Sequence, residues 1–348
     1  MQIKTLAIIV AGVGNTGSHL LPHLARMPQV ERITMVDHDV YDEKNLLVQD
    51  IDSCDIGKPK VSAQAEKLRR INPRLDVSAM QERIEDSPLG KLRCDLLVSC
   101  LDSRAARQYV NQVATRLNMP WIDCGILGSQ NLVRVNSYAP GQDAPCLECS
   151  WGPDDYSLLE QEYLCGASSG AAFHTMASSA LGALAASLMA LEIAKLFSGE
   201  LTVHAASRQI LLDANNHILR VSSFRRSPDC RFDHMAWIVS PWRCQPESTS
   251  VASALKELGS VQIEGHLFVR KLICPGCKRQ EQSLRLNRPL AHCATCGRRM
   301  VSIGFGSLEC LDADSAGEFL NLTLAQIGLR DGDIINSGKN NHWLMEAA

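Results

Sequence analysis

Residues 6–39 read LAIIVAGVGNTGSHLLPHLARMPQVERITMVDHD, and the rest of the chain is built around this stretch. It predicts a buried strand at Ala7–Val10, a glycine turn, and a helix that begins near Ser18. The turn spaces its glycines as G-x-G-x-x-G, with Gly12, Gly14 and Gly17. Backbone N–H groups at a helix N-terminus can hold phosphate only where no side chain larger than glycine blocks the approach. The stretch therefore predicts a nucleotide-binding unit of the form strand, helix, strand.

An acidic pair, Asp37 and Asp39, ends the second predicted strand, Ile33–Val36. Asp37 follows Gly17 by twenty residues, which places its carboxylate to accept hydrogen bonds from a ribose hydroxyl. The pattern indicates a nucleotide without saying which one. A nicotinamide or flavin enzyme and a user of ATP remain open, and a glycine turn without a ligand is the third alternative.

Length and composition limit what surrounds that site. A chain of 348 residues predicts one large domain and a smaller one, and its net charge of −3 gives no electrostatic case for a nucleic-acid or membrane partner. The apolar segment Met176–Phe197 carries Glu192 and Lys195, which favours a buried helix over a membrane span. The apolar start runs directly into the glycine turn, so we expect no signal peptide and a cytoplasmic location.

Two further stretches carry charges where a nucleotide site would need them. Lys58 and Lys60 lie at the start of a predicted helix, where cations oppose the helix dipole unless they meet an anion. A solvated lysine pair is the alternative. Asp102 follows the apolar strand Asp95–Cys100, at the edge of the sheet where ligands bind. Asp102 either caps the helix that begins near Ala105 or serves a metal and phosphate site.

Seven of the fourteen cysteines stand at metal-like spacings, which indicates a reducing compartment and bound zinc. Cys146 and Cys149 form one C-x-x-C pair, and Cys230 with His234 supplies the other half of a tetrahedral zinc site. A second site has the pattern C-x2-C, fifteen residues, C-x2-C that is typical of a zinc ribbon. Its ligands are Cys274, Cys277, Cys293 and Cys296.

The character of the chain changes near Gln245. We therefore predict a domain over residues 1–244 that holds the nucleotide and the first zinc. Residues 245–348 would form the zinc ribbon and a small β-rich module that docks a partner. The tail is weakly similar to part of a β-grasp fold.

The order of these motifs resembles one family, the ThiF/MoeB superfamily of adenylating enzymes, which includes ubiquitin-activating enzymes and their sulfur-carrier relatives. The matching pieces lie between residues 6 and 234: GVGNTG, VDHD, NLLVQ, IGKPKVSA, LDSRAAR, PCLEC, MALEIAKL and RRSPDC. Of the nucleotides left open above, the resemblance strongly favours ATP. It implies a Rossmann-like doubly wound α/β sheet, in which Asp37 holds the ribose, Asn45 and Gln49 face the phosphates, Lys60 contacts phosphate, and Asp102 helps to bind Mg²⁺.

The resemblance also implies the reaction and the partners. ATP, Mg²⁺ and two Zn²⁺ ions per chain would serve adenylation of the C-terminal carboxylate of a ubiquitin-like β-grasp protein. Thioester formation and transfer to a conjugating enzyme would follow, and the chain would form a homodimer. One departure is Val48, where the family carries an arginine, and Arg69, Arg70 and Arg107 are candidate replacements. The alternatives are a sulfur-carrier adenylyltransferase without a thioester and a degenerate nucleotide-binding scaffold.

A thioester needs a cysteine that is free of zinc, able to ionise and placed on an accessible segment. Cys165 follows the charged segment DDYSLLEQEY and precedes GASSGA, where the family's crossover loop carries its reactive cysteine. Cys165 is therefore our predicted nucleophile, and Cys244 is the alternative. Cys94, Cys100 and Cys124 lie in or beside predicted core strands and should be inert.

Overall fold

The structure is a computed structural model, and it describes residues 5–164, 177–198, 207–288, 292–303, 306–338 and 341–347. The chain divides into two compact units. Unit 1 comprises residues 1–84 together with Cys94–Ala236, and unit 2 comprises Glu85–Arg93 together with Trp237–Ala348. Sequence analysis placed the division after Cys244. The compact units divide at Trp237 instead, and unit 2 also includes the short segment Glu85–Arg93.

Unit 1 alternates strands and helices along the chain. Its elements are β1 (Leu6–Ala11), α1 (Asn15–Leu24), β2 (Val30–Val36), α2 (Lys60–Ile71), β3 (Asp76–Met80), β4 (Leu96–Ser99), α3 (Arg104–Arg116), β5 (Trp121–Leu127), β6 (Leu132–Tyr138), α4 (Pro153–Leu164), α5 (Ser179–Ser198), β7 (Arg208–Asp213) and β8 (Ile218–Ser223). Short 3-10 helices lie between them at η1 (Glu43–Leu47), η2 (Ser53–Asp55), η5 (Gly128–Gln130) and η6 (Leu147–Ser150).

The eight strands form one sheet in the order β3-β2-β1-β4-β5-β6-β7-β8. Strands β1 to β5 pair in parallel, and β6, β7 and β8 continue the sheet in antiparallel fashion. The central strand β4 is apolar but for Ser99 and buried at every position, and β1 is apolar and buried at all but one, because helices cover both faces of the sheet there. The carboxyl ends of β1 and β4 lie side by side, which is where a doubly wound sheet binds its ligand.

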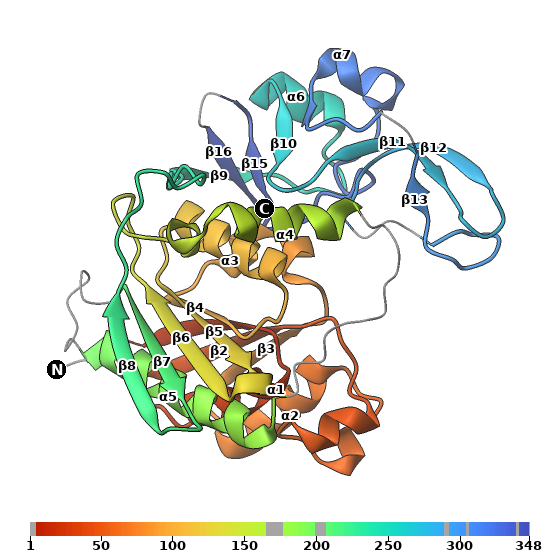
Figure 1. Cartoon of the computed structure of the whole chain (residues 1–348). Coiled ribbons are helices and arrows are strands. Elements are labelled where there is room, and N and C mark those ends of the chain that lie inside the picture. Colours follow the sequence, from red (N-terminus) through yellow and green to blue (C-terminus); the bar gives the residue numbers. More distant parts are fainter. Residues whose placement is uncertain are drawn as a thin grey trace. The chain divides into compact units, whose positions relative to one another are not determined.

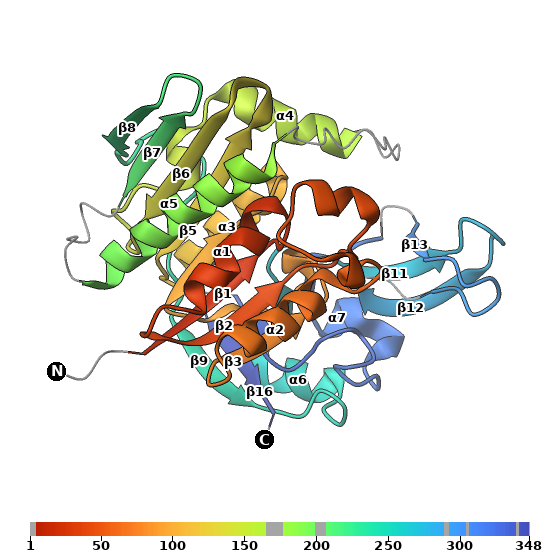
Figure 2. The same cartoon turned by 90° about the horizontal axis from the view of Figure 1, so that it is seen from below.

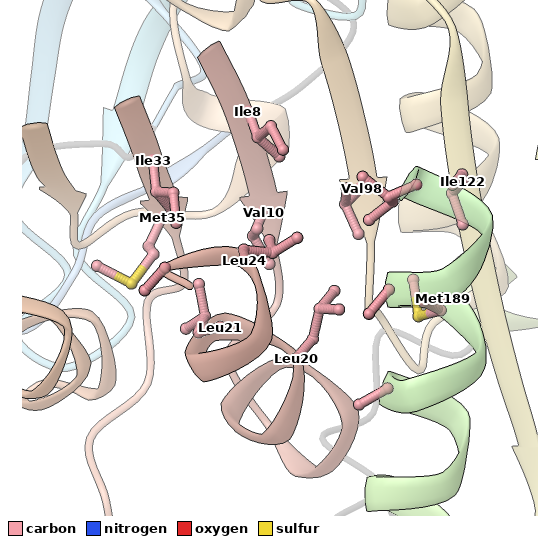
Figure 3. Close-up of a cluster of buried hydrophobic side chains, with 14 of the residues drawn as sticks. Ile8, Val10, Leu20, Leu21, Leu24, Ile33, Met35, Val98, Ile122 and Met189 are labelled. Atoms are coloured by element: carbon pink, nitrogen blue, oxygen red, sulfur yellow. The ribbon is translucent and has the colours of Figure 1, made fainter. Parts of the chain in front are cut away.

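Figure 1 shows α1, α2 and α5 on one face of this sheet and α3 on the other, and Figure 2 shows the face with α1 and α5 from below. Leu20, Leu21 and Leu24 recur at helical spacing along α1 and are wholly buried. Together with Met189 of α5 they pack onto apolar side chains of β1, β2, β4 and β5 (Figure 3). This core fixes α1, and hence the glycine turn, relative to the strand ends.

Helix α5 is long and apolar enough, by length and composition, to cross a membrane. In the structure Ala185, Ala186, Met189 and Ile193 are wholly buried in the core of unit 1. The charged side chain of Glu192 is buried as well, and it pairs with Lys195 and Arg208. These contacts are those of a core helix.

Unit 2 contains a five-stranded sheet in the order β14-β10-β15-β16-β9 and a three-stranded sheet in the order β12-β11-β13. Its elements are η3 (Ile84–Asp86), which overlaps its first residues, η4 (Leu89–Leu92), β9 (Val239–Arg243), α6 (Val251–Leu258), β10 (Val261–Ile263), β11 (Phe268–Ile273), β12 (Gln280–Leu286), β13 (Val301–Ser302), β14 (Cys310–Leu311), α7 (Ala313–Ala316), η8 (Gly317–Phe319), β15 (Ile334–Asn336) and β16 (His342–Glu346).

The segment Glu85–Arg93 is bonded into unit 2 by backbone and side-chain contacts. His266 Nε2 lies 2.8 Å from the carbonyl oxygen of Glu85, and Gly90 N donates to the Gly332 carbonyl oxygen at 2.8 Å. Arg330 donates to the carbonyl oxygen of Asp86. Unit 2 is therefore connected to unit 1 at both ends of this segment as well as at Trp237.

Candidate functional site

The glycine turn joins β1 to α1 and leaves the N-terminus of α1 open. Gly12 has φ +87°, and a methyl group at this position would lie 2.7 Å from the carbonyl oxygen of Cys100. A methyl group at Gly17 would lie 2.2 Å from the carbonyl oxygen of Gly12. These two glycines are therefore required by the packing of the turn against the end of β4 and against itself.

Gly14 is different, because packing does not account for it. Gly14 is the N-cap residue of α1, and a methyl group there would meet no atom of the described residues within 4 Å, apart from its neighbours in the chain and the backbone of the helix itself. The N–H groups in the first turn of α1 have no earlier carbonyl within the helix to bond. Open space in front of these donors is what a phosphate group requires.

The predicted acidic pair lies beside this turn. Asp37 accepts hydrogen bonds from Val13 N at 2.7 Å and from Asp39 N at 2.9 Å, so it braces the turn. Lys60, the first residue of α2, donates to Asp39 Oδ2 at 2.8 Å. Burial disfavours the charged form of Asp39, but the hydrogen bond and charge of Lys60 outweigh it and lower the pKa of Asp39. The structure thus brings Asp37, Asp39 and Lys60 to the glycine turn.

The two lysines at the start of α2 have different surroundings. Lys58 pairs with Asp55 at 3.3 Å and with Glu66 at 3.2 Å on the surface. Lys60 is buried and meets only Asp39 among the carboxylates of the described residues. Of the pair, Lys60 is the one held beside the turn.

The segment after Asp39 folds back over the turn and over α1. Tyr41 OH donates to the carbonyl oxygen of Val13 at 3.3 Å, and Asp50 N donates to Ser18 Oγ at 2.9 Å. Asn45 is used in a local capping box with Asp42 at the start of η1. The buried Oε1 atom of Gln49 has no hydrogen-bond partner within the described ranges. Gln49 therefore has an unused acceptor on a segment held against α1.

Asp102 does not cap the helix that follows it, so that alternative was wrong. The N-cap of α3 is Ser103, whose side chain accepts from Ala106 N. Asp102 is left exposed after the end of β4. Gly12 lies against Cys100 and Leu101, and Asp102 is the next residue of that segment.

Sequence analysis missed a buried charge cluster at the same edge of the sheet. Asp123 of β5 is wholly buried, and its carboxylate lies 3.4 Å from Arg107 and 3.1 Å from Arg134. Ser99 Oγ of β4 donates to the same carboxylate at 3.1 Å. A sequence signal for this cluster existed, because the apolar strands β5 and β6 each contain one charged residue, Asp123 and Arg134. In the sheet Gly125 lies directly opposite Arg134.

Position 48 is valine, and two of the three candidate replacement arginines have other partners. Arg69 donates to the carbonyl oxygen of Val77 at 2.9 Å. Arg107 donates to the carbonyl oxygens of Leu101 and Cys124, in addition to its ion pair. Arg70 forms no hydrogen bond or ion pair with any described residue, so it alone has a free guanidinium group.

The first predicted zinc set comes together in unit 1. The four ligand atoms of Cys146, Cys149, Cys230 and His234 all lie within 4.8 Å of one another. Cys146 Sγ is 3.8 Å from Cys230 Sγ, and His234 Nε2 is 3.4 Å from Cys230 Sγ. A tetrahedral zinc with Zn–S bonds of about 2.3 Å requires ligand atoms about 3.5–3.8 Å apart. The donor set and its spacing fit zinc.

The second set comes together in unit 2. The sulfurs of Cys274, Cys277, Cys293 and Cys296 also lie within 4.8 Å of one another, with Cys277 Sγ 3.5 Å from Cys293 Sγ. The N–H group of Thr295 donates to Cys293 and lowers the pKa of that thiol to about 6. A thiol that ionises near neutral pH is a ready metal ligand.

The remaining cysteines differ in their suitability as nucleophiles. Burial raises the pKa of Cys94 and of Cys124 to about 12 and raises that of Cys100 as well. Burial also raises the pKa of Cys244 to about 11, and this thiol is only 6% exposed. Cys54 and Cys310 are exposed. Cys165, the predicted nucleophile, lies outside the described residues.

Curated proteins with related sequences are adenylyltransferases. The chain is 24% identical to molybdopterin-synthase adenylyltransferase of Escherichia coli over 66% of this chain and 87% of that protein. It is 27% identical to the sulfur carrier protein ThiS adenylyltransferase of E. coli over 64% of this chain and 84% of that protein. It is 28% identical to adenylyltransferase and sulfurtransferase UBA4 of Yarrowia lipolytica, but over only 43% of this chain and 37% of that protein.

Solved structures share the fold. The structure of E. coli MccB with ATP matches with a TM-score of 0.55 and 22% identity, over 66% of this chain and 68% of that one. Residues 1–232 match the ThiF family, which covers about two thirds of the chain and all of the glycine turn, the acidic pair, Lys60 and Asp102. The chain belongs to the ThiF family.

Proposed function

We propose that the chain uses ATP to adenylate the C-terminal carboxylate of a small ubiquitin-like β-grasp protein. The observation that carries this proposal is the open N-terminus of α1, where Gly14 leaves space in front of unpaired N–H groups beside Asp37, Lys60 and Asp102. Two relatives of the chain, molybdopterin-synthase adenylyltransferase and the sulfur carrier protein ThiS adenylyltransferase, are adenylyltransferases, which supports the same reaction class.

The reaction brings two anions together, because a carboxylate attacks the α-phosphorus of ATP and pyrophosphate leaves. The N–H groups of the first turn of α1 and the ammonium of Lys60 would provide fixed positive potential where this charge develops. Asp102 would hold Mg²⁺, which supplies further charge compensation when bound. Lys60 would exchange its bond to Asp39 for one to a phosphate oxygen, since its ammonium is held beside the turn.

The two cysteine clusters would each hold a structural zinc. The first cluster takes ligands from η6 and its N-cap and from the segment Cys230–His234. A zinc ion there would hold together two segments that are far apart in the chain. The second would hold together the ribbon that contains β11, β12 and β13. Neither site leaves an open ligand position, because four protein ligands complete a tetrahedral zinc.

Exchange of radioactive pyrophosphate into ATP tests adenylation directly. We expect exchange that depends on Mg²⁺ and on a β-grasp protein with a free C-terminal carboxylate. Proteins of the molybdopterin-synthase, ThiS and ubiquitin-like types would be compared, since the names of the relatives point to them. Nucleotide binding without exchange, over the whole set, would count against the proposal.

A scaffold that binds nucleotide without catalysis is the second candidate function. Val48 favours it, because the guanidinium that would face the phosphates is missing there and Arg69 and Arg107 are bonded elsewhere. The same exchange assay separates the two, and an Arg70→Gln variant shows whether that free arginine takes over. Exchange that survives Arg70→Gln excludes Arg70 as the replacement.

We further propose that the acyl group passes from the adenylate to Cys165, with release of AMP and formation of a thioester. The buried, weakly acidic Cys244 is a poor alternative nucleophile at neutral pH. Cys165→Ser should keep pyrophosphate exchange but lose a reductant-sensitive adduct with the β-grasp protein. An adduct that persists in Cys165→Ser and disappears in Cys244→Ser would reassign the nucleophile. If the wild type forms no adduct, the reaction ends at the adenylate, as in a sulfur-carrier adenylyltransferase.

A further inference from the structure

Two side chains of α1 hold the start of α5. Asn15, the first residue of α1, donates through Nδ2 to the carbonyl oxygens of Ala177 and Ser178, each at 3.2 Å. His19, one turn further along α1, has Nε2 3.1 Å from Ser179 Oγ. Three successive residues at the beginning of α5 are thus bonded to one face of the helix that opens with the glycine turn.

The fit around Asn15 is close on the α5 side. A methyl group at Gly182 would lie 1.8 Å from Asn15 Oδ1 and 2.5 Å from Asn15 Cγ. Glycine at 182 is therefore required by the presence of asparagine at 15. The Oδ1 atom itself is buried, and no donor in the described ranges reaches it. The amide nitrogen thus makes both of its hydrogen bonds within the described part of the chain to the start of α5.

Ser178 extends the connection into the backbone of α5. Its carbonyl oxygen accepts from Asn15, while its hydroxyl oxygen accepts from Leu181 N at 3.3 Å. The same carbonyl oxygen also accepts from Gly182 N at 3.1 Å. The first amides of α5 are thus bonded to a residue whose position Asn15 fixes.

From these contacts we infer that Asn15 is a positioning residue that couples the phosphate-binding turn to the start of α5. Phosphate would bind the N–H groups of the first turn of α1, the turn that also carries the Asn15 side chain. Anything that orders this turn therefore also orders Ala177, Ser178 and the first amides of α5. The inference rests on the proposed function, because it takes ATP as the ligand of the turn.

Amide hydrogen exchange with and without Mg·ATP tests the coupling, with no protein substrate present. In the wild type we expect saturating Mg·ATP to slow exchange of the Leu181 and Gly182 amides about tenfold, within the range found for coupled sites. Asn15→Ala should abolish this protection even when titration calorimetry shows that the nucleotide is bound. Ser187→Ala, whose hydroxyl bonds only to the carbonyl oxygen of Ala183 on α5, is the matched control and should keep the protection.

Gly182→Ala and the double variant Asn15→Ala, Gly182→Ala distinguish coupling from packing. Gly182→Ala should lower the melting temperature and lose the protection, because its methyl group displaces the Asn15 side chain. The double variant removes the clash, so its melting temperature should rise towards that of Asn15→Ala while the protection stays absent. A double variant that regains protection would show that packing alone transmits the signal, and the inference would be overturned.

The result for the wild type separates this inference from the function on which it rests. Bound Mg·ATP without protection at Leu181 and Gly182 would overturn the coupling and leave the proposed function standing. Failure of Mg·ATP to bind at all would overturn the proposed function, and the inference would fall with it. Protection that Asn15→Ala retains would show that Asn15 is not the residue that transmits it.

Discussion

Lys60 is the residue on which the proposed charge compensation depends most directly. Its ammonium is buried and bonded to Asp39, while the neighbouring Lys58 pairs with Asp55 and Glu66 at the surface. Under the proposed function, removing Lys60 takes a fixed cation from the place where negative charge would develop. Such a loss costs about a hundredfold or more in rate.

Lys60→Ala and Asp102→Ala should each abolish pyrophosphate exchange and leave the fold intact. Lys60→Ala removes the cation, and Asp102→Ala removes the carboxylate proposed to hold Mg²⁺. Circular dichroism and melting temperature check the fold, and Lys58→Ala is the matched control that should keep exchange. Full exchange in either of the first two variants would mean that the site has been assigned to the wrong residues.

His266 gives unit 2 a predicted dependence on pH. Burial and then the charge of Arg288 lower the pKa of this histidine, so the folded state keeps the ring neutral. The unfolded chain takes up a proton below a pH of about 6.5, and the free energy of unfolding should therefore fall as pH drops through that value. His266→Gln can still donate to the Glu85 carbonyl oxygen and should show a flatter dependence. Urea titrations at pH 7 and pH 5 give the free energy of unfolding of both proteins. If it falls by the same amount in the wild type and in His266→Gln, His266 is not the cause.

The elements around the site show what sequence patterns reveal and what they leave out. The glycine spacing, the apolar strands and the helix at Lys60 predict the unit of strand, turn, helix and strand and the place of the turn, because each depends on residues close in sequence. The bonds from Asn15 to α5 join residues far apart in the chain, which only the packing of the two helices brings together. The Asp123 cluster has a sequence signal, a single charge in each of two neighbouring strands, but only the folded sheet shows that Asp123 and Arg134 meet.

The two cysteine clusters are the elements most open to a direct chemical test. We expect two zinc ions per chain by metal analysis, and Cys296→Ser should reduce this number to one. Removal of zinc with a chelator should unfold the ribbon, because metal binding supplies folding free energy in small metal-bound modules. A single zinc per wild-type chain would mean that the cluster of Cys146, Cys149, Cys230 and His234, which is assembled from distant segments, does not bind zinc.

At the scale of the molecule, several exposed apolar side chains of unit 1 lie together on the edge strand β8, namely Ile218, Leu219 and Val221. Others lie on α5 and on the segment after β2, among them Leu191 and Leu47. An open edge strand with apolar side chains favours pairing with another chain. Together with the family resemblance, this surface supports the expected homodimer.

Sedimentation at micromolar concentration should show a dimer, and Val221→Lys should shift the chain towards monomer because it places a charge in a buried interface. Val301→Lys, at another exposed valine, on β13 of unit 2, is the control and should leave the dimer unchanged. A wild-type monomer under these conditions would contradict the expectation. A dimer that resists Val221→Lys would place the interface elsewhere.

We propose that this ThiF-family chain transfers AMP to a protein carboxylate. Intact-mass spectrometry of a β-grasp protein, incubated with the chain, Mg·ATP and pyrophosphatase, detects this transfer. We expect an adduct of one AMP on the β-grasp protein that is absent when its C-terminal carboxylate is amidated and absent with Asp102→Ala. An adduct that forms equally on the amidated protein, or bound ATP that never yields an adduct with any β-grasp protein, would contradict the claim.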